Sequence, residues 1–190
     1  LFKRNFNLIT SASIGLFDNF DDLKLASDSI LPHVRTDIVK YLQGTKDFSI
    51  EQFQLNYFKN PYKDIYTRVS GGIFEMMFMG IGGEVLYRPF FKNYGIGAEL
   101  WQVKQRDFNG KFGLQDYSVL TGHLNLFYLE PRSQVLISLK GGRFLAKDSG
   151  INFDFSRRFK SGLTIGAFFA RTDISKFEFG EGSFDKGFYF

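Results

Sequence analysis

Apolar and polar residues alternate along most of this chain with a period of two. The alternation is clearest over residues 118–129, where apolar positions are Leu120, Leu124, Leu126 and Tyr128, and the positions between them include Thr121, His123 and Asn125. A period of two is typical of a β-strand, because successive side chains in a strand point to opposite faces. The pattern therefore predicts a sheet whose two faces differ in chemistry.

The same alternation predicts further strands before and after this one. Together with 118–129 they make about ten, at residues 5–16, 49–58, 64–75, 83–88, 94–106, 134–144, 150–157 and 163–172, with a last strand beginning near Gly187. The glycines at 80, 82 and 83 are interpreted as a turn or bulge at the start of the strand 83–88. A phosphate-binding loop would need a helix directly after them, whereas residues 84–88 alternate as a strand does.

The connectors between these strands fall into two alternating classes. Tight connectors at 59–63, 90–93, 130–133 and 158–161 carry Pro, Asn, Lys or Arg, which are expected in turns. The others, mostly longer, lie at 18–48, 76–82, 107–116, 146–149 and 173–186. The alternation predicts one all-β domain over residues 1–190, an antiparallel up-and-down β-barrel. Outer-membrane barrels have short turns at one end and long loops at the other, although a soluble barrel with a decorated mouth would show the same asymmetry.

The longest connector, 18–48, contains one helical pattern. Val34, Ile38, Tyr41 and Leu42 recur at i, i+4, i+7 and i+8, which predicts a short amphipathic helix over residues 35–43. Loops of this length in compact domains are commonly functional. Two hypotheses stand equally: the loop folds into or over the mouth of the barrel, or the helix docks on the rim.

Alternation alone does not say which face points outward. In a soluble lipocalin-like barrel the apolar face lines the interior, whereas in a membrane barrel it meets lipid. The polar positions here hold mainly Asn, Ser, Thr, Gly and Gln, whereas a sheet facing water usually carries more Lys and Glu. The 25 Phe and 9 Tyr also suit the aromatic belts of a membrane barrel. The pattern therefore favours a transmembrane barrel, and no run of 18 apolar residues suggests a membrane-spanning helix.

Net charge and the reactive side chains exclude fewer classes of function than the alternation pattern does. The 24 basic and 20 acidic residues are interspersed, so the net charge of +4 is interpreted as a mixed-charge surface, and no nucleic-acid partner is expected. The absence of cysteine excludes disulfides and thiolate metal sites. His33 lies near Asp28 and Asp37, but this spacing matches no known metal-ligand pattern. His123 is interpreted as a structural histidine beside Thr121, so we expect no cofactor and no catalysis.

Several blocks of sequence, spread in order over nearly the whole chain, carry a family resemblance. They are residues 31–38, 68–75, 80–89, 121–123 with Tyr117, 156–159 and 179–187. In these blocks the chain resembles the YjbH and GfcD type of bacterial protein. The resemblance implies an outer-membrane β-barrel tied to exopolysaccharide and capsule production. It also implies that this chain is a fragment, lacking a signal peptide, an N-terminal part and the end of the barrel, since proteins of that type are several times longer.

Ionisable residues within the strands are the candidate binding residues. They are Arg68, Glu75, Glu84, Arg88, Glu99, Lys104 and Arg143, with Asp154 as a further strand charge. A lysine or arginine facing lipid at the bilayer midplane costs about 2–4 kcal/mol. We therefore expect these side chains to point inward, or to lie near an interface, and to pair into a network. The alternative is that the Arg and Lys members bind an anionic polysaccharide.

The expected setting is the Gram-negative outer membrane, as the resemblance implies. Expected partners are outer-membrane lipid, an anionic polysaccharide and other exopolysaccharide-export proteins. Two other classes stay open. One is an outer-membrane lipid-modifying enzyme, which a serine or carboxylate within hydrogen-bond reach of His123 would favour. The other is a soluble lipocalin-like ligand-binding barrel.

Overall fold

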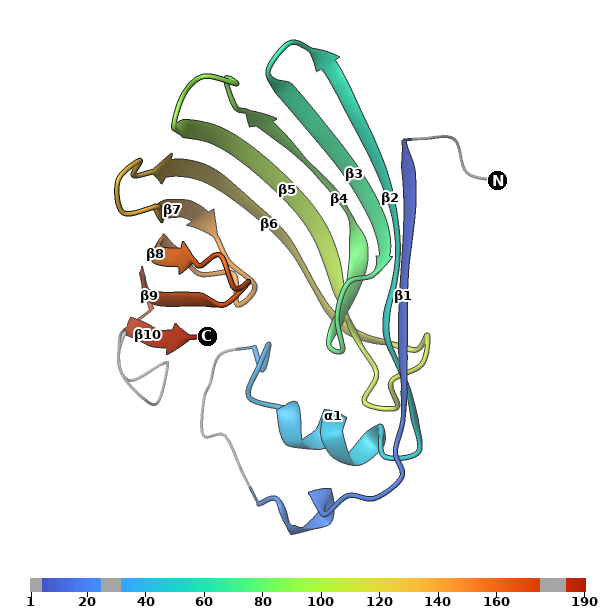
Figure 1. The fold of residues 1–190 in the computed structure, drawn as a ribbon. Coiled ribbons are helices and arrows are strands. Elements are labelled where there is room, and N and C mark those ends of the chain that lie inside the picture. The colour runs from blue at the N-terminus through green and yellow to red at the C-terminus, as the bar shows by residue number, and fades with distance from the viewer. Residues whose placement is uncertain (1–4, 25–31, 175–183) are drawn as a thin grey trace.

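The chain forms one antiparallel sheet of ten strands with two short helices (Figure 1). The computed structural model describes residues 5–24, 32–174 and 184–190. Every neighbouring pair of strands is consecutive in sequence, so the sheet is an up-and-down meander, as the alternation predicts. The strands are β1 (Phe6–Ile14), β2 (Phe48–Tyr62), β3 (Ile65–Ile73), β4 (Phe78–Tyr87), β5 (Tyr94–Arg106), β6 (Leu114–Leu129), β7 (Val135–Arg143), β8 (Ser149–Arg158), β9 (Thr164–Thr172) and β10 (Phe184–Tyr189).

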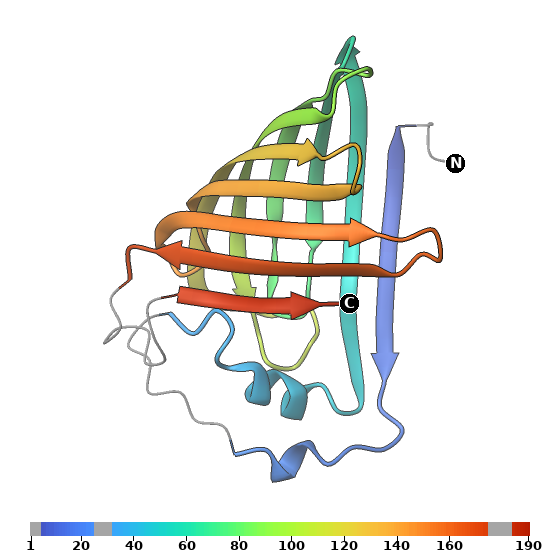
Figure 2. The ribbon, with the colours of Figure 1, turned by 60° about the vertical axis from the view of Figure 1, so that its left-hand side comes forward.

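The sheet curves into a trough that stays open (Figures 1 and 2). Within the described residues, β1 pairs only with β2, and β10 pairs only with β9. In Figure 2 the strands turn progressively, so that β1 and β10 run in clearly different directions. The all-β antiparallel fold is confirmed. The sheet of the described residues is open, so the expected barrel is not seen as a closed barrel within this chain.

The fourth strand begins earlier than the sequence suggests. β4 starts at Phe78, so the glycines interpreted as a turn or bulge lie inside a regular strand that pairs on both sides. A Cβ atom at Gly82 would collide with the Trp101 ring and with the Leu100 carbonyl. Glycine is therefore needed there so that the Trp101 side chain can lie across the neighbouring strand. The strand β10 likewise begins at Phe184, before the expected Gly187.

Helix α1 (Ile38–Gly44) and the one-turn helix η1 (Phe20–Asp22) lie at the end of the sheet that carries the long connectors (Figure 1). The helix predicted for residues 35–43 is thus confirmed, with a shift of its boundaries. Its buried Tyr41 packs with Met77, Phe78, Val103 and Val119 in the main apolar cluster. Neither described helix has the length and apolar character needed to cross a membrane.

Tyr41 also ties this helix to the end of β5. Its hydroxyl donates a hydrogen bond to the Arg106 carbonyl oxygen over 2.5 Å, and Gln115 donates to the same oxygen over 2.8 Å. Burial raises the pKa of the Tyr41 hydroxyl, so the group remains a donor at any ordinary pH. The helix is therefore fixed to the sheet by both apolar packing and a buried hydrogen bond. We call α1 together with the connectors 74–77 and 107–113 the cap.

The apolar face of the sheet is on its outer, convex side, whereas in a soluble barrel the apolar face lines the interior. Apolar side chains stand on the convex side and are exposed, for example Leu124 at 68%, Ile81 at 61% and Leu100 at 57%. Polar side chains on the concave side are buried, including Asn56 at 1% and Ser70 at 1%. The small apolar cluster at the cap therefore does not cover the main apolar surface of the protein.

Candidate functional site

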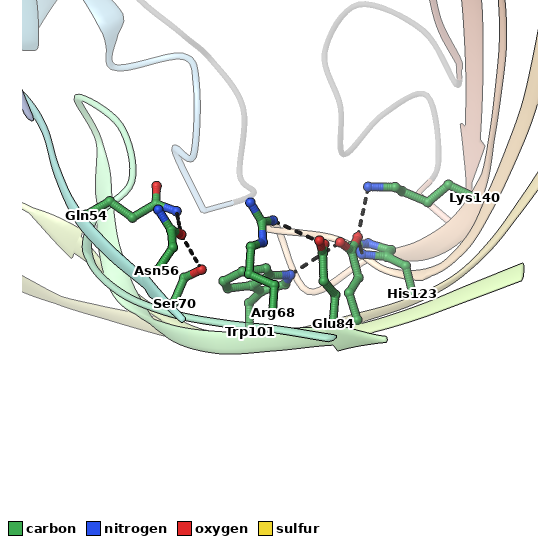
Figure 3. Close-up of polar contacts among 9 residues, drawn as sticks. Gln54, Asn56, Arg68, Ser70, Glu84, Trp101, His123 and Lys140 are labelled. Carbon is green, nitrogen blue, oxygen red and sulfur yellow. Dashed lines mark hydrogen bonds and ion pairs between the residues drawn. The ribbon is translucent and has the colours of Figure 1, made fainter. Parts of the chain in front are cut away.

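A row of ionisable side chains crosses the concave face from β3 to β6 (Figure 3). The strand register places Arg68 opposite Glu84, Glu84 opposite Glu99, and Glu99 opposite His123. Residues opposite each other in an antiparallel ladder share a face and come within reach of one another. Four residues far apart in sequence thus form one continuous line, which we call the charged row.

Glu99 is the centre of the charged row. Its Oε1 atom lies 2.9 Å from His123 Nδ1 and accepts a hydrogen bond from Lys140 Nζ over 2.9 Å. Its Oε2 atom accepts a weaker bond from Trp101 Nε1 over 3.4 Å. An ionised carboxylate only accepts, so this arrangement fixes the hydrogen of the imidazole on Nδ1. The Lys140 ammonium bound to Glu99 favours the ionised form of the carboxyl group.

Arg68 closes the other end of the charged row. Its Nη2 atom donates to Glu84 Oε2 over 3.1 Å, and its guanidinium lies 5.5 Å from the centre of the Trp101 ring. A guanidinium over an indole face is attracted to the electrons of the ring. Trp101, the one tryptophan of the chain, therefore contacts both Arg68 and Glu99.

A second, uncharged network lies beside the charged row on β1 to β3. Asn56 accepts from Gln54 over 2.5 Å and from Ser70 over 2.6 Å, and it donates to Asn7 over 3.3 Å. Figure 3 shows Gln54, Asn56 and Ser70 grouped at one end of the row. The concave face is thus polar from β1 to β6, and the buried amides Gln54 and Asn56 on β2 are satisfied.

The middle of the charged row, at Glu84 and Glu99, borders a hollow of about 250 Å³. Its lining comes from consecutive strands, from β4 to β8 without a gap. The lining residues are Glu84, Glu99, Asn125, Phe127, Ser138, Lys140, Asn152 and Asp154. Opposite Asn125, the register places Gly97, whose missing side chain leaves room beside the amide. A solute inside the trough would therefore meet carboxylates, amides, a hydroxyl, one ammonium group and one aromatic ring.

The structure brings together some of the residues that the sequence nominated and separates others. Arg68, Glu84 and Glu99 form the charged row, and Asp154 lines the hollow. Glu75 lies in the connector after β3, where its carboxylate binds Arg35 over 2.7 Å. The remaining three lie elsewhere. The strand register places Lys104 and Arg143 on the convex face, and Arg88 is exposed just after β4. Arg68, Glu84 and Glu99 thus form an inward network, the others do not join it, and ligand binding by these residues stays a prediction.

Sequence reasoning missed Lys140, Trp101 and Arg106 as site residues. Lys140 sits on the polar side of its strand pattern, so its inward position could have been predicted from alternation. Arg106 is fully buried, and its guanidinium donates four hydrogen bonds of 2.7–3.0 Å to the carbonyl oxygens of Glu75, Met76, Gly110 and Lys111. A strand-terminal arginine gives no sequence signal for this role.

The two histidines occupy different settings. His33 Nδ1 lies 3.1 Å from Asp37 Oδ1, while Asp28 lies outside the described residues. No cluster of three potential metal ligands occurs in the part of the chain that the structure describes. His123 contacts Glu99 in place of the expected Thr121, and its ring packs against Phe144 at 4.8 Å between centroids. The carboxylate contact that would favour an enzyme is therefore present.

A double-mutant cycle can test how strongly the centre of the charged row is coupled. We expect Glu99→Gln and His123→Asn each to lower the free energy of unfolding, because each weakens or removes the hydrogen bond of a buried polar partner. The coupling energy should be about 1–3 kcal/mol, as for residues in direct contact. Unfolding by denaturant of the single and double variants measures it. Additive effects of the two substitutions would contradict the contact.

Fold and site together define a class of protein. The chain is a curved, two-faced all-β sheet with an exposed apolar convex face, a polar concave face and a helical cap at one end. The family of exopolysaccharide biosynthesis proteins described as "Exopolysaccharide biosynthesis protein YbjH" matches residues 1–190. The chain therefore belongs to the YjbH family, as the sequence blocks indicate, and this membership supports a role in exopolysaccharide production.

A curated relative gives the scale of the match. The chain is 38% identical over 192 residues to the "Uncharacterized lipoprotein YjbH" of Escherichia coli strain K12, an alignment that covers 96% of this chain. The same alignment covers 27% of the relative, so the chain spans about a quarter of that protein's length. The relative is a lipoprotein, which is compatible with a membrane-associated location in the cell envelope. No solved structure matches the chain.

Proposed function

We propose that this chain is a section of an outer-membrane β-barrel that takes part in exopolysaccharide production or export without catalysing a reaction. The observation that carries the proposal is the exposed apolar convex face over a polar concave face. In water such a surface is unfavourable, whereas a lipid bilayer stabilises it. A polar interior is in turn what a polymer of sugars can contact.

The dimensions of the strands support the membrane setting. A strand needs about 9–11 residues to cross a bilayer. β2, β5 and β6 have 15, 13 and 16 residues, and every other strand except β10 has at least nine. Tight turns join the strands at one end, and the longer connectors lie at the other end, beside α1 (Figure 1). In an outer-membrane barrel the cap would then lie at the extracellular end.

One specific observation favours a second candidate, the lipid-modifying enzyme. Glu99 and His123 are arranged like the carboxylate and the imidazole of a nucleophilic triad. A triad also needs a nucleophile at the other imidazole nitrogen, and His123 Nε2 is buried with no hydrogen-bond partner among the described residues. Phe144 packs on this imidazole. These contacts suit a structural role better than proton transfer to a substrate.

The soluble lipocalin-like alternative requires the apolar face to line the interior of the barrel. The curvature of the sheet puts that face outside, with Leu124 more than half exposed. A soluble version would need a partner over most of the convex surface. The membrane proposal needs no protein partner for that surface, although other export proteins could contact the edges or the cap.

The proposed function can be tested in cells and in extracts. We expect the full-length protein to be released from envelopes only by detergent and to migrate differently on a gel when it is not heated. Deletion of its gene should lower the amount of secreted exopolysaccharide, and re-expression should restore it. Release into the soluble fraction as a stable monomer would contradict the membrane setting. Unchanged polymer output in the deletion strain would contradict the role in production.

A further inference from the structure

The hollow on the concave face contains a buried polar group that the fold does not satisfy. Asn125 is 8% exposed, and its Oδ1 atom has no hydrogen-bond partner in the described part of the chain. Leaving a buried acceptor unpaired costs about 1–3 kcal/mol. The amides of the neighbouring network, such as Asn56, are satisfied. The Asn125 amide lines the hollow with unused hydrogen-bonding capacity, and its Oδ1 atom can accept from a donor in the trough once the amide turns toward it.

Two further polar side chains around the hollow share this capacity. Ser138 and Asn152 form no side-chain hydrogen bond with another described residue, and both line the hollow with Asn125. The register makes the three neighbours: Lys140 lies opposite both Asn125 and Asn152, and Ser138 is two positions before Lys140 on the same face. The hollow thus offers unused amide and hydroxyl groups that both donate and accept hydrogen bonds.

The aromatic residue in the lining and the size of the hollow indicate the class of ligand. The Phe127 ring gives an apolar patch beside these polar groups, as small-molecule sites commonly do. Sugar hydroxyls donate and accept, and the C–H face of a sugar ring is apolar, so a sugar unit can use both kinds of contact. The hollow of about 250 Å³ lies below the usual range of ligand pockets, which suits one small unit of a polymer.

Charge decides between neutral and anionic sugars. Three carboxylates line the hollow, from Glu84, Glu99 and Asp154, against one ammonium group, from Lys140. That ammonium is already bound to Glu99, and the nearby Arg68 is bound to Glu84. An anionic ligand would therefore meet unfavourable charge, because both of these cations are already paired.

We propose that the hollow around Asn125, Ser138 and Asn152 binds an uncharged sugar unit of the exopolysaccharide. The inference rests on the proposed function, because it takes the polymer as the solute that enters the trough. It adds the locus and the ligand chemistry, and it assigns the binding role to amides and a hydroxyl in place of the Arg and Lys side chains. Asn125 accepts from a sugar hydroxyl, and Phe127 contacts the face of the ring.

The experiment uses the full-length protein in detergent micelles. The probes are the neutral and the acidic oligosaccharides obtained by partial hydrolysis of the exopolysaccharide whose output depends on the protein, separated by anion exchange. Isothermal titration should show binding of the neutral fraction and weaker or no binding of the acidic fraction. Asn125→Leu should weaken neutral binding about tenfold, the effect of one lost hydrogen bond at the upper end of the usual range.

Stability separates a binding role of Asn125 from a structural one. Asn125→Leu removes an unsatisfied acceptor, so the melting temperature should stay the same or rise while binding falls. Asn152→Ala, at a less buried position, should also weaken binding and serves as the second variant if the first does not fold. Asn93→Ala, in the exposed turn after β4, is the matched control and should bind as the parent protein does.

Three results would overturn the proposal: tighter binding of the acidic fraction, no binding of the neutral fraction, or unchanged binding by both Asn125→Leu and Asn152→Ala. Each can occur in a protein that is embedded in the membrane and needed for polymer output. Failure of the sugar site is therefore distinguishable from failure of the proposed function, which detergent extraction and polymer output test separately.

Discussion

Replacement of Arg106 by methionine is expected to lower the free energy of unfolding by at least about 1–3 kcal/mol, the cost of leaving a buried acceptor without its donor. The guanidinium donates to four carbonyl oxygens in the connectors 74–77 and 107–113. These connectors come from different hairpins and are joined through this one side chain. Without it the four carbonyls lose a charged donor at a position that is closed to water.

Unfolding by denaturant and limited proteolysis of the full-length protein measure this effect. We expect faster cleavage in the connector 107–113, because the cap should open before the sheet does. Arg106→Lys should restore only part of the stability, since an ammonium has three donors and cannot reach four carbonyls in the planar geometry of a guanidinium. Arg88→Met, at an exposed position, is the control. A stability within about 0.5 kcal/mol of the parent protein, as at ordinary surface positions, would contradict the role of Arg106.

Replacement of Leu124 by arginine is expected to impair assembly into the membrane. Leu124 lies in the middle of β6 on the convex face, opposite Ala98 and Gly141, and it is 68% exposed. An arginine facing lipid near the bilayer midplane costs about 2–4 kcal/mol. Most of the variant should therefore be lost from the detergent-extracted, heat-modifiable fraction.

Two controls separate the lipid effect from a general effect on folding. Leu124→Phe keeps an apolar side chain and should assemble normally. Asn152→Arg places the same charge on the concave face, where the polar trough should tolerate it. If Leu124→Arg assembled as well as the parent protein, the convex face would be a surface for water and not for lipid.

Alternation predicted much of this fold because each side of a strand meets one environment along its whole length. It located β6 and β7 within a few residues, and the helical period in 18–48 located α1. It failed at β4, because Gly80, Gly82 and Gly83 were interpreted as a turn. The role of Gly82 depends on Trp101, which lies across the neighbouring strand and is distant in sequence.

The candidate site was predictable only in part, for a similar reason. Side chains alternate between the two faces of a strand, and a charge that faces lipid is costly. Arg68, Glu84 and Glu99 could therefore be predicted to lie on the inner face as a network. The unsatisfied Asn125 amide was not, because it depends on Gly97 opposite and on which neighbours are already bonded. Alternation alone could not predict the open edges at β1 and β10, since closure depends on the pairing of strands far apart in the chain.

The central claim is that the convex face lies against lipid while the concave face lies against water. Single cysteines can carry spin labels along β6 at positions 120, 121, 123, 124, 125 and 126, after replacement of any cysteine outside these 190 residues, which contain none. Collisions of a spin label with oxygen report that the label lies in lipid, and collisions with a water-soluble nickel complex report that it lies in water. The account predicts that the full-length protein in bilayers shows an alternation: labels at 120, 124 and 126 respond to oxygen, and those at 121, 123 and 125 do not. Access of the nickel complex to labels at 120, 124 and 126 would contradict it.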